Sequence, residues 1–489
     1  MAEFNLKKPK VKLKSFKHFV SALMPHEIDF LAQKAKFTDS TNQLLFEQIK
    51  HAVNFPEHAM QFDETLDKRK YNYMTNWISK QLASIDVDQQ FKWMHYLDEQ
   101  IMTDQISQEE ELQLIGHIKK YTQSEYYFIR FYELAQNYRN YLLIRMRISY
   151  LSIVSAFIKE QRHNYQEALE INHLLHDATN DIVNQYITKT SDSRQWEQKL
   201  IDIFYDSSLD GLNRYYAIVR LTFIYYNYKE FHKLTRLYND LDQLIISGQI
   251  YSKRILVNYY ANRLLLHSRY NELDKAAYYG YLSIKVHSSD YLFYVNNLSG
   301  ILLRRDKTTE ALQLMEDNLC EFKQNISPHT RIGFVSYYVK SLNQNGKHRK
   351  ALRFSQHFMD QHIKDILNYR WRMFFMAYFE TLLALKMYAQ IIMTHKKHKL
   401  HTKEALFMEY PDSLPGIDWY YQLALYKEGN LDINQFKMKI SGSLRRGIHK
   451  RYIPQLQQLI GILRPHIPEL VRFLDNITKN SKYDLTSTN

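Results

Sequence analysis

A helix–turn–helix pattern recurs along this chain about every forty residues, and it restricts the fold more than any other feature. Seven segments share an aromatic-rich amphipathic run, a short polar turn and a second run. The first inward residues of the second runs are predicted to be Ala168, Phe231, Leu273, Ala311, Ala351, Ile391 and Ile433. Their successive spacings are 63, 42, 38, 40, 40 and 42 residues. Repetition at this period is typical of stacked helical hairpins, and the interval of 63 predicts an extra helix around residues 193–205.

The composition favours helices in every part of the chain. Only 12 Gly and 9 Pro occur in 489 residues, and the turns of sheet proteins consume both residue types. The 39 Tyr and 26 Phe lie mostly on apolar stripes, as in "YFIRFYELAQNYRNYLL" (127–143), where rings fill the space between helices. We therefore predict an all-α fold with negligible sheet.

The stretch "NQNGKHRKALRFSQHFM" (343–359) shows how one predicted hairpin turns. Gly346 takes the left-handed position of the turn, and Ala351 and Phe354 point inward at helical spacing. Four basic residues then fall on the outer side, namely Lys347, Arg349, Lys350 and Arg353. A solvated outer face is the favoured interpretation of this charge run, and a functional basic patch is the alternative.

Three of these segments carry a family resemblance. "WYYQLALYKEGNLDINQF" (419–436) resembles the tetratricopeptide (TPR) pattern of aromatic, Leu, small residue, Tyr and Gly, and "VKSLNQNGKHRKAL" and "LLRRDKTTEAL" resemble its turn. The likeness covers about residues 140–440, with longer helices because the family period is about 34. It implies a right-handed α-solenoid and a non-catalytic scaffold or adaptor that binds a protein or peptide in its concave groove.

The resemblance also implies which residues face that groove. Counting back by the family's offsets puts Ala261, Ser299 and Val339 at the close-packing position of three repeats. The same count places seven residues on the inner face, namely Asn258, Asn262, Asn296, Arg304, Ser336, Lys340 and Asn343. Asparagine amides both donate and accept, which suits an extended peptide, although such residues also form ordinary hydrated surfaces. The likeness to carboxylate-clamp TPR proteins is partial, because the expected Lys and Arg are mostly replaced.

The flanks differ from the array. We predict a helical N-terminal region over residues 1–120, with a capping box at Ser107 and Glu110. The repeat array is expected over 121–450. Closing helices broken at Pro465 and Pro468 are expected over 451–477, and a disordered polar tail over 478–489.

The positive charge leaves nucleic acid or ribonucleoprotein binding as the alternative function. Net charge is +13 with a pI near 9.2. Basic side chains gather in the six lysines among the first seventeen residues, in Lys396, Lys397 and Lys399, and in Arg445, Arg446, Lys450 and Arg451 beside Tyr452. Such stretches could bind phosphates. No convincing helix-turn-helix accompanies them, because the best candidate segment contains Pro56.

No motif for catalysis or for a cofactor is present, so neither an enzyme nor a cofactor nor a metal site is predicted. His395, His398 and His401 have helical spacing, but the lysines around them oppose a cation, and a basic surface loop is favoured. His357, Asp360 and His362 are interpreted as exposed helix residues. Cys320 is expected to be a buried, inert thiol.

A single cysteine excludes an internal disulfide and agrees with a reducing compartment. A membrane span needs about 20 consecutive apolar residues, and the chain offers no such run. We therefore expect a cytoplasmic protein that does not enter a membrane. The oligomeric state stays open.

Overall fold

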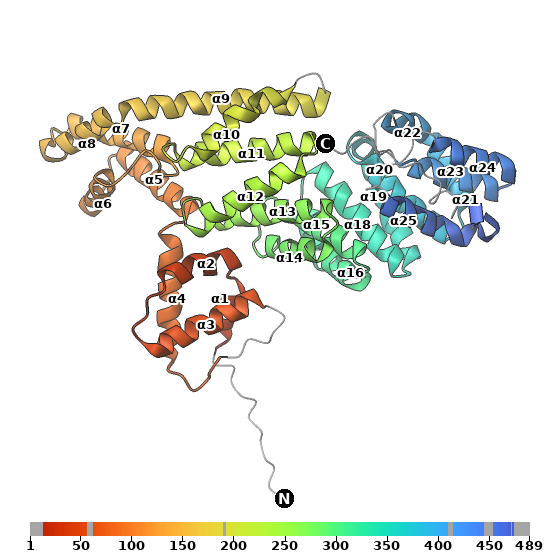
Figure 1. The fold of residues 1–489 in the computed structure, drawn as a ribbon, viewed down its shortest axis with the longest axis horizontal. Coiled ribbons are helices and arrows are strands. Elements are labelled where there is room, and N and C mark those ends of the chain that lie inside the picture. Colours follow the sequence, from red (N-terminus) through yellow and green to blue (C-terminus); the bar gives the residue numbers. More distant parts are fainter. Residues whose placement is uncertain are drawn as a thin grey trace, which may run out of the picture. The chain divides into compact units, whose positions relative to one another are not determined.

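The chain is helical throughout the part that the structure describes (Figure 1). The structure, a computed structural model, describes residues 13–55, 62–188, 192–408, 414–444, 453–470 and 472–473. Within these ranges there is no β-strand, and the one isolated bridge joins Asp86 to Tyr251. The predicted all-α class is confirmed.

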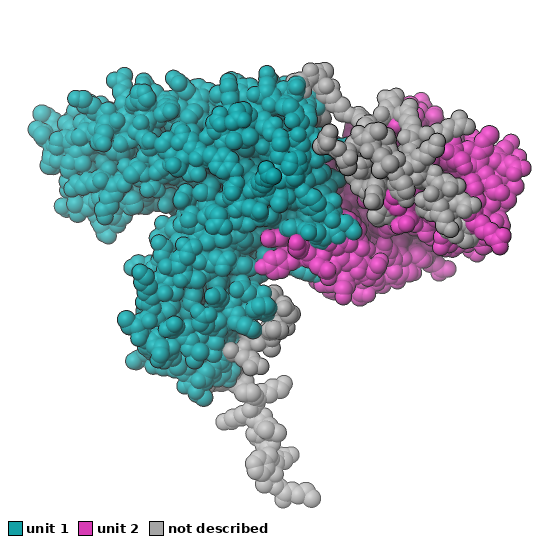
Figure 2. All heavy atoms as spheres, viewed as in Figure 1, with its two compact units in different colours: residues 1–272, 281–286 teal, residues 273–280, 287–489 magenta. Residues whose placement is uncertain are grey.

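The helices form two compact units (Figure 2). Unit 1 comprises residues 1–272 and 281–286, and unit 2 comprises residues 273–280 and 287–489. The limits predicted at residues 120 and 450 fall inside unit 1 and unit 2 respectively. The helix α14 (Leu273–Ser283) contributes residues to both units.

Unit 1 holds the helices of the N-terminal half. They are α1 (Lys14–Ser21), α2 (Pro25–Lys34), α3 (Ser40–Asn54), α4 (Lys68–Ala83), α5 (Val87–Met102), α6 (Gln108–Ile118), α7 (Phe128–Ile144), α8 (Ile148–Glu160), α9 (Arg162–Thr188), η1 (Ser193–Trp196), α10 (Glu197–Tyr205), α11 (Gly211–Asn227), α12 (Phe231–Ile246) and α13 (Lys253–Arg269). The pair of η1 and α10 spans 193–205, so the extra helix predicted from the long interval is confirmed.

Unit 2 holds the helices of the C-terminal half. They are α15 (Tyr291–Arg304), α16 (Thr308–Asp317), α17 (Leu319–Gln324), α18 (Pro328–Gln344), α19 (His348–Asn368), α20 (Trp371–Ala384), α21 (Tyr388–Lys397), α22 (Leu400–Met408), α23 (Gly416–Lys427), α24 (Ile433–Ser443), α25 (Ile453–Leu463), η3 (Arg464–His466) and η4 (Pro468–Leu470). Along this unit α18 packs on α15 and α20, and α20 packs on α23. The predicted breaks at Pro465 and Pro468 are confirmed, because α25 ends just before them.

The N-terminal helices are joined to the rest of unit 1 by a polar contact. α2 packs on α12, and the two ring nitrogens of His26 share hydrogen bonds with Asp242 (2.7 Å) and with the Tyr260 hydroxyl (2.8 Å). The predicted capping box starts α6, because the Ser107 N–H donates to Glu110 at 2.7 Å and the Glu110 N–H donates to Ser107 Oγ at 3.4 Å.

One turn geometry ends the first helix of six consecutive hairpins. Its central residue has a positive φ between 57° and 72°, and the six residues are Lys229, Asn271, Asp306, Gly346, Lys386 and Gly429. In each turn the next N–H donates to a carbonyl five residues back, as Lys347 does to Leu342 at 2.9 Å and Met387 does to Leu382 at 2.9 Å. This is the Schellman motif, which satisfies the last carbonyls of a helix.

These turns correct the register of the predicted anchors. Ala168, Ala311, Ala351 and Ile391 are buried as predicted, but Phe231 and Leu273 are only half-buried and Ile433 is exposed. Each of these three residues is the first residue of its helix, so it lies before the first position that points inward. Five residues after the left-handed residue, every hairpin from the first to the fifth has a fully buried side chain, namely Leu234, Ala276, Ala311, Ala351 and Ile391.

Other predictions about packing are confirmed. Phe131 and Tyr138, from the aromatic-rich run, are completely buried. Around the Gly346 turn, Lys347, Arg349, Lys350 and Arg353 are exposed, and Phe354 is half-buried. None of the helices in the described ranges is long and apolar enough to cross a membrane. The N-terminal lysines up to Lys12, Pro56, the basic run 445–452 and the tail from 474 lie outside the described residues.

We predict that the turn residues contribute to stability through backbone conformation alone. No atom lies within 4 Å of a Cβ placed on Gly346, so Gly346→Ala should lower the free energy of unfolding by about 1 kcal/mol without any clash. Lys386→Gly should have the opposite sign, because Lys386 already carries that strain at φ 58°. Urea unfolding followed by circular dichroism measures both. Equal stability of the two variants would contradict this account of the turns.

Candidate partner-binding groove

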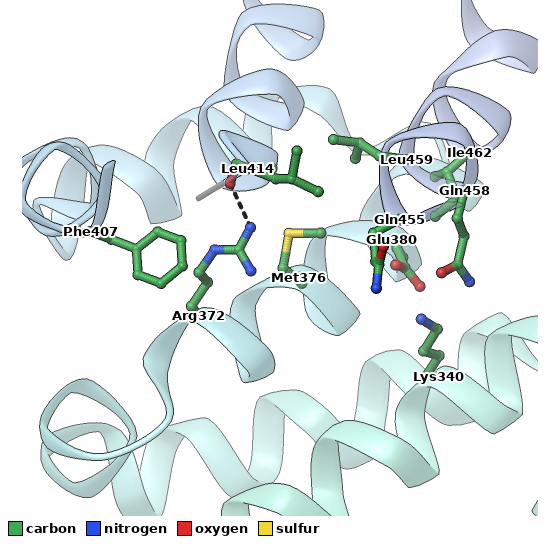
Figure 3. A pocket seen from close by; sticks show the side chains of 11 residues that line it. Lys340, Arg372, Met376, Glu380, Phe407, Leu414, Gln455, Gln458, Leu459 and Ile462 are labelled. Atoms are coloured by element: carbon green, nitrogen blue, oxygen red, sulfur yellow. Dashed lines mark hydrogen bonds between the residues drawn. The ribbon is translucent and has the colours of Figure 1, made fainter. Parts of the chain in front are cut away.

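Two adjoining cavities lie on unit 2, between α18, α20, the segment before α23, and α25 (Figure 3). We call the larger one, of about 560 Å³, the groove, and the smaller one, of about 320 Å³, the chamber. Both are lined by Lys340, Arg372, Met376, Glu380 and Phe407. The groove is also lined by Ser336, Tyr337, Tyr369, Arg370, Trp371, Met373 and Ala377. The chamber, which Figure 3 draws, is also lined by Leu414, Gly416, Gln455, Gln458, Leu459 and Ile462.

Two asparagine amides hold the helices that carry the groove. The Asn343 amide donates to Thr381 Oγ1 at 2.9 Å and to the Ala377 carbonyl at 3.2 Å, which joins α18 to α20. The Asn296 amide donates to the Thr330 carbonyl at 3.0 Å, which joins α15 to α18. A buried amide stabilises a contact only where its partners are in place, so these bonds fix how neighbouring first helices face the groove.

Lys340 and Glu380 occupy equivalent positions on neighbouring first helices. Each lies six residues before the left-handed residue of its own turn, Gly346 or Lys386. The Tyr420 hydroxyl donates to Glu380 at 3.3 Å. Burial raises the pKa of Glu380, and the Lys340 charge and the Tyr420 bond oppose that rise. Among the described residues Lys340 has no hydrogen bond or ion pair, and its ammonium points toward Glu380 and Gln458 (Figure 3).

Arg372 lies where groove and chamber meet. Its Nη2 donates to the Leu414 carbonyl at 2.7 Å, and its guanidinium lies 4.6 Å from the centre of the Phe407 ring. Its Nε is buried without a hydrogen-bond partner. A Cβ on Gly416 would come within 2.7 Å of the Met376 sulfur and 3.3 Å of Arg372 Nη2, so a larger residue there would make the Met376 side chain shift.

Among charged neighbours, Glu404 has the largest effect on the pKa of Arg372, and its side chain is only 3% exposed. It caps α23 from a neighbouring helix, because the Ile417 N–H donates to Glu404 Oε1 at 3.0 Å. Pro415 at the N-cap makes no side-chain cap bond of its own. Burial raises the pKa of Glu404 to about 8 against the opposing charge of Arg372. Glu404 Oε2 is left without a hydrogen-bond partner.

Aromatic and cationic side chains follow one another at the entrance to α20. Tyr369 is exposed, and Trp371 and Tyr337 are half-buried. Arg370 Nε donates to His329 Nε2 at 2.7 Å, and burial together with the Arg370 charge lowers the pKa of His329. The histidine is therefore the neutral acceptor of that bond. Flat rings and a guanidinium group together offer stacking surfaces to a ligand.

The structure brings two of the seven predicted inner-face residues, Ser336 and Lys340, to the groove. Ser336 is itself buried and donates to the Ile332 carbonyl at 2.7 Å. Asn296 and Asn343 lie between helices, in the bonds described above. Arg304 is exposed near the end of α15.

The remaining two, Asn258 and Asn262, lie on α13 in unit 1 and contact one another. The Asn262 amide donates to the Asn258 carbonyl at 3.0 Å and to its side-chain oxygen at 3.1 Å. They were counted from Leu273, which precedes the equivalent buried residue Ala276 by three positions. The count therefore selected a different stripe of α13 from the one selected on α15 and α18.

Sequence reasoning missed the other groove residues, among them Arg370, Trp371, Arg372 and Glu380. A signal existed for Glu380, which follows Lys340 by forty residues, one full period. No such signal marks Arg372, because its site depends on Phe407 and Leu414 from later elements.

Two local predictions are wrong. Cys320 is exposed, because the chain breaks between α16 and α17 at Asn318 and the new helix buries Phe322 instead. His395 is no surface residue, being 1% exposed and stacked on Tyr421 with ring centroids 3.9 Å apart. Burial lowers the pKa of His395 to about 4. His401 and the adjacent lysines are exposed as predicted.

His357 and Asp360 are exposed, whereas His362 is half-buried at a kink in α19. Across the described ranges, no group of three or more His, Cys, Asp or Glu side chains is placed to hold a metal ion.

No protein-family model matches the chain, and no curated protein or solved structure matches it. The interpretation of the groove therefore depends on its geometry.

We predict that Glu404 makes the stability of the protein fall as pH rises. Its pKa is about 8 in the folded state and near 4.5 in the unfolded state, so between these values the folded state binds more protons. The contribution of Glu404 to the stability is fully present below about pH 4.5, and it is lost as the pH rises to about 8. Glu404→Gln should therefore match the natural protein at about pH 5 and exceed it by about 4 kcal/mol at about pH 8.5.

Urea unfolding at the two pH values measures this difference, with Glu428→Gln as the control at an exposed glutamate. If the free energy of unfolding changes equally with pH in the natural protein and in Glu404→Gln, then Glu404 is ionised in the folded state.

Proposed function

We propose that the protein is a non-catalytic scaffold or adaptor that binds an extended segment of a partner protein in the groove of unit 2. In this proposal the hairpins of unit 2 form part of a right-handed, TPR-like α-solenoid. The regular spacing of the Schellman turns and the packing of successive first helices α15, α18, α20 and α23 support it. Stacked hairpins of this kind leave their first helices in a row that a peptide can follow.

The observation that carries the proposal is the composition of the groove. Tyr369 and Trp371 offer apolar surface at its edge, and Lys340 and Arg370 offer charge beside them. The groove and the chamber have volumes within the range of ligand sites. Exposed aromatic and arginine side chains around a cavity are also what binding hot spots contain. A polypeptide, with alternating side chains and amides, matches this mixture.

We predict that the groove aromatics determine peptide affinity. Peptides selected from a random display library on the purified full chain should lose about 30-fold in affinity to Tyr369→Ala or Trp371→Ala, the size of one hot spot of about 2 kcal/mol. Phe223→Ala is the matched control, because Phe223 and Tyr369 are each 55% exposed and Phe223 lies in unit 1. Fluorescence anisotropy gives the affinities, and circular dichroism verifies the fold. Selected peptides that bind the two groove variants as tightly as the natural chain would exclude the groove.

Nucleic-acid binding is the second candidate, and exposed cations favour it. Lys396, Lys397 and Lys399 are all exposed near the junction of α21 and α22. Exposed lysines can neutralise phosphates and release the counterions that the nucleic acid had bound.

We predict that, if nucleic acid is the partner, replacing these three lysines by Gln reduces the salt slope of binding by at most about three ions. Binding of single-stranded and duplex oligonucleotides over a series of salt concentrations measures the slope. Absence of binding at low salt, where attraction is strongest, would eliminate this candidate.

A further inference from the structure

Two hydrogen-bond donors of the chamber are unused. Arg372 Nε is buried without a partner, and the Lys340 ammonium has no hydrogen bond among the described residues. The Leu414 carbonyl already accepts from Arg372 Nη2, and the Glu380 carboxyl accepts from Tyr420. A buried donor without a partner is costly, so a ligand that supplies acceptors gains free energy here.

The charges in the chamber are also poorly balanced. Burial holds Glu404 largely protonated at neutral pH, and it favours the protonated form of Glu380 as well. Arg372 keeps its charge at that pH, since an arginine loses its proton only under strongly basic conditions. A largely buried cation whose acidic neighbour is protonated attracts an anion strongly.

The shape of the chamber favours a planar anion that is attached to an aliphatic chain. The Arg372 guanidinium is held between Phe407 and the Leu414 carbonyl, so it presents one fixed edge. Carboxylates match such an edge with two parallel hydrogen bonds. Met376, Leu459 and Ile462 form apolar walls beside it (Figure 3). Aliphatic carbons fit against those walls.

We infer that the chamber binds a carboxylate, with Arg372 and Lys340 as its donors, and that a peptide in the adjoining groove supplies it. The peptide as the source depends on the proposed function, whereas the carboxylate site depends on the chamber alone. The carboxylate belongs either to an Asp or Glu side chain or to the C-terminus of the partner. Both sources have the same chemistry, and small probes distinguish them.

The test uses the full chain labelled with ¹³C at the methionine methyl groups. The Met376 methyl lies in the chamber, and its signal is assigned with Met376→Leu. Three probes of similar size are titrated, namely N-acetylglutamate α-amide with a side-chain carboxylate, N-acetylleucine with a terminal carboxylate, and the neutral N-acetylglutamine α-amide. We expect a saturable shift of the Met376 signal with at least one carboxylate and no shift with the neutral probe. The exposed Met438 serves as the internal reference.

Substitutions then test the two donors. Arg372→Gln should weaken carboxylate binding at least tenfold and Lys340→Gln about fivefold, while Lys347→Gln at an exposed turn lysine should leave it unchanged. The other methionine signals show whether each variant is folded. If Arg372→Gln disturbs the fold, Lys340→Gln alone decides, because Lys340 has no hydrogen bond or ion pair to lose among the described residues.

Several results would overturn the carboxylate site. They are no saturable shift with either carboxylate, an equal shift with the neutral probe, a larger shift with inorganic phosphate, or unchanged affinity in Lys340→Gln. Because the probes are not peptides, this outcome is independent of the display experiment. A carboxylate site without selectable peptides would refute the proposed function only, and selectable peptides without the site would refute this inference only.

Discussion

The backbone of six hairpin turns sets the positions on which the rest of the structure depends. A left-handed residue ends each first helix, and the following N–H reaches back five residues to close it. In the first five of these hairpins the fifth residue after the left-handed one is the first inward position of the second helix. That position holds Leu234, Ala276, Ala311, Ala351 and Ile391, all completely buried. Small residues predominate there because neighbouring helices approach closely.

The turns also explain how far the sequence could predict the fold. The period, the all-α class and the extra helix at 193–205 follow from hydrophobic spacing alone, which tolerates an error of a few residues. The register needs the left-handed residue itself, and only Gly346 and Gly429 announce it. Lys229 and Lys386 adopt that backbone without being residues that favour it. At Leu273 the turn residue is Asn271, and the predicted inward residue was placed two positions after it rather than five. This shift of three residues led to the choice of Asn258 and Asn262.

The candidate site was predictable only in the part that repeats. Lys340 lines the groove at a position that follows from the period, and Glu380 follows from the same rule. Asn296 and Asn343 were polar residues on helices, and the sequence does not distinguish an amide that faces water from one that joins two helices. Arg372 and Glu404 belong to no repeat position, since their partners come from α22 and the start of α23.

Where the repeat ends, its chemistry changes as well. The inward positions are constrained to small or apolar residues by packing, so a repeat array can vary freely only along its inner and outer faces. At α20 the equivalent of Lys340 becomes Glu380, and the next helices bring Arg372, Phe407 and Gly416 into contact. α25 then supplies a further wall through Gln455, Gln458, Leu459 and Ile462. The chamber therefore takes its lining from α18, α20, α22, the start of α23 and α25 together, which is why no single repeat position in the sequence could predict it.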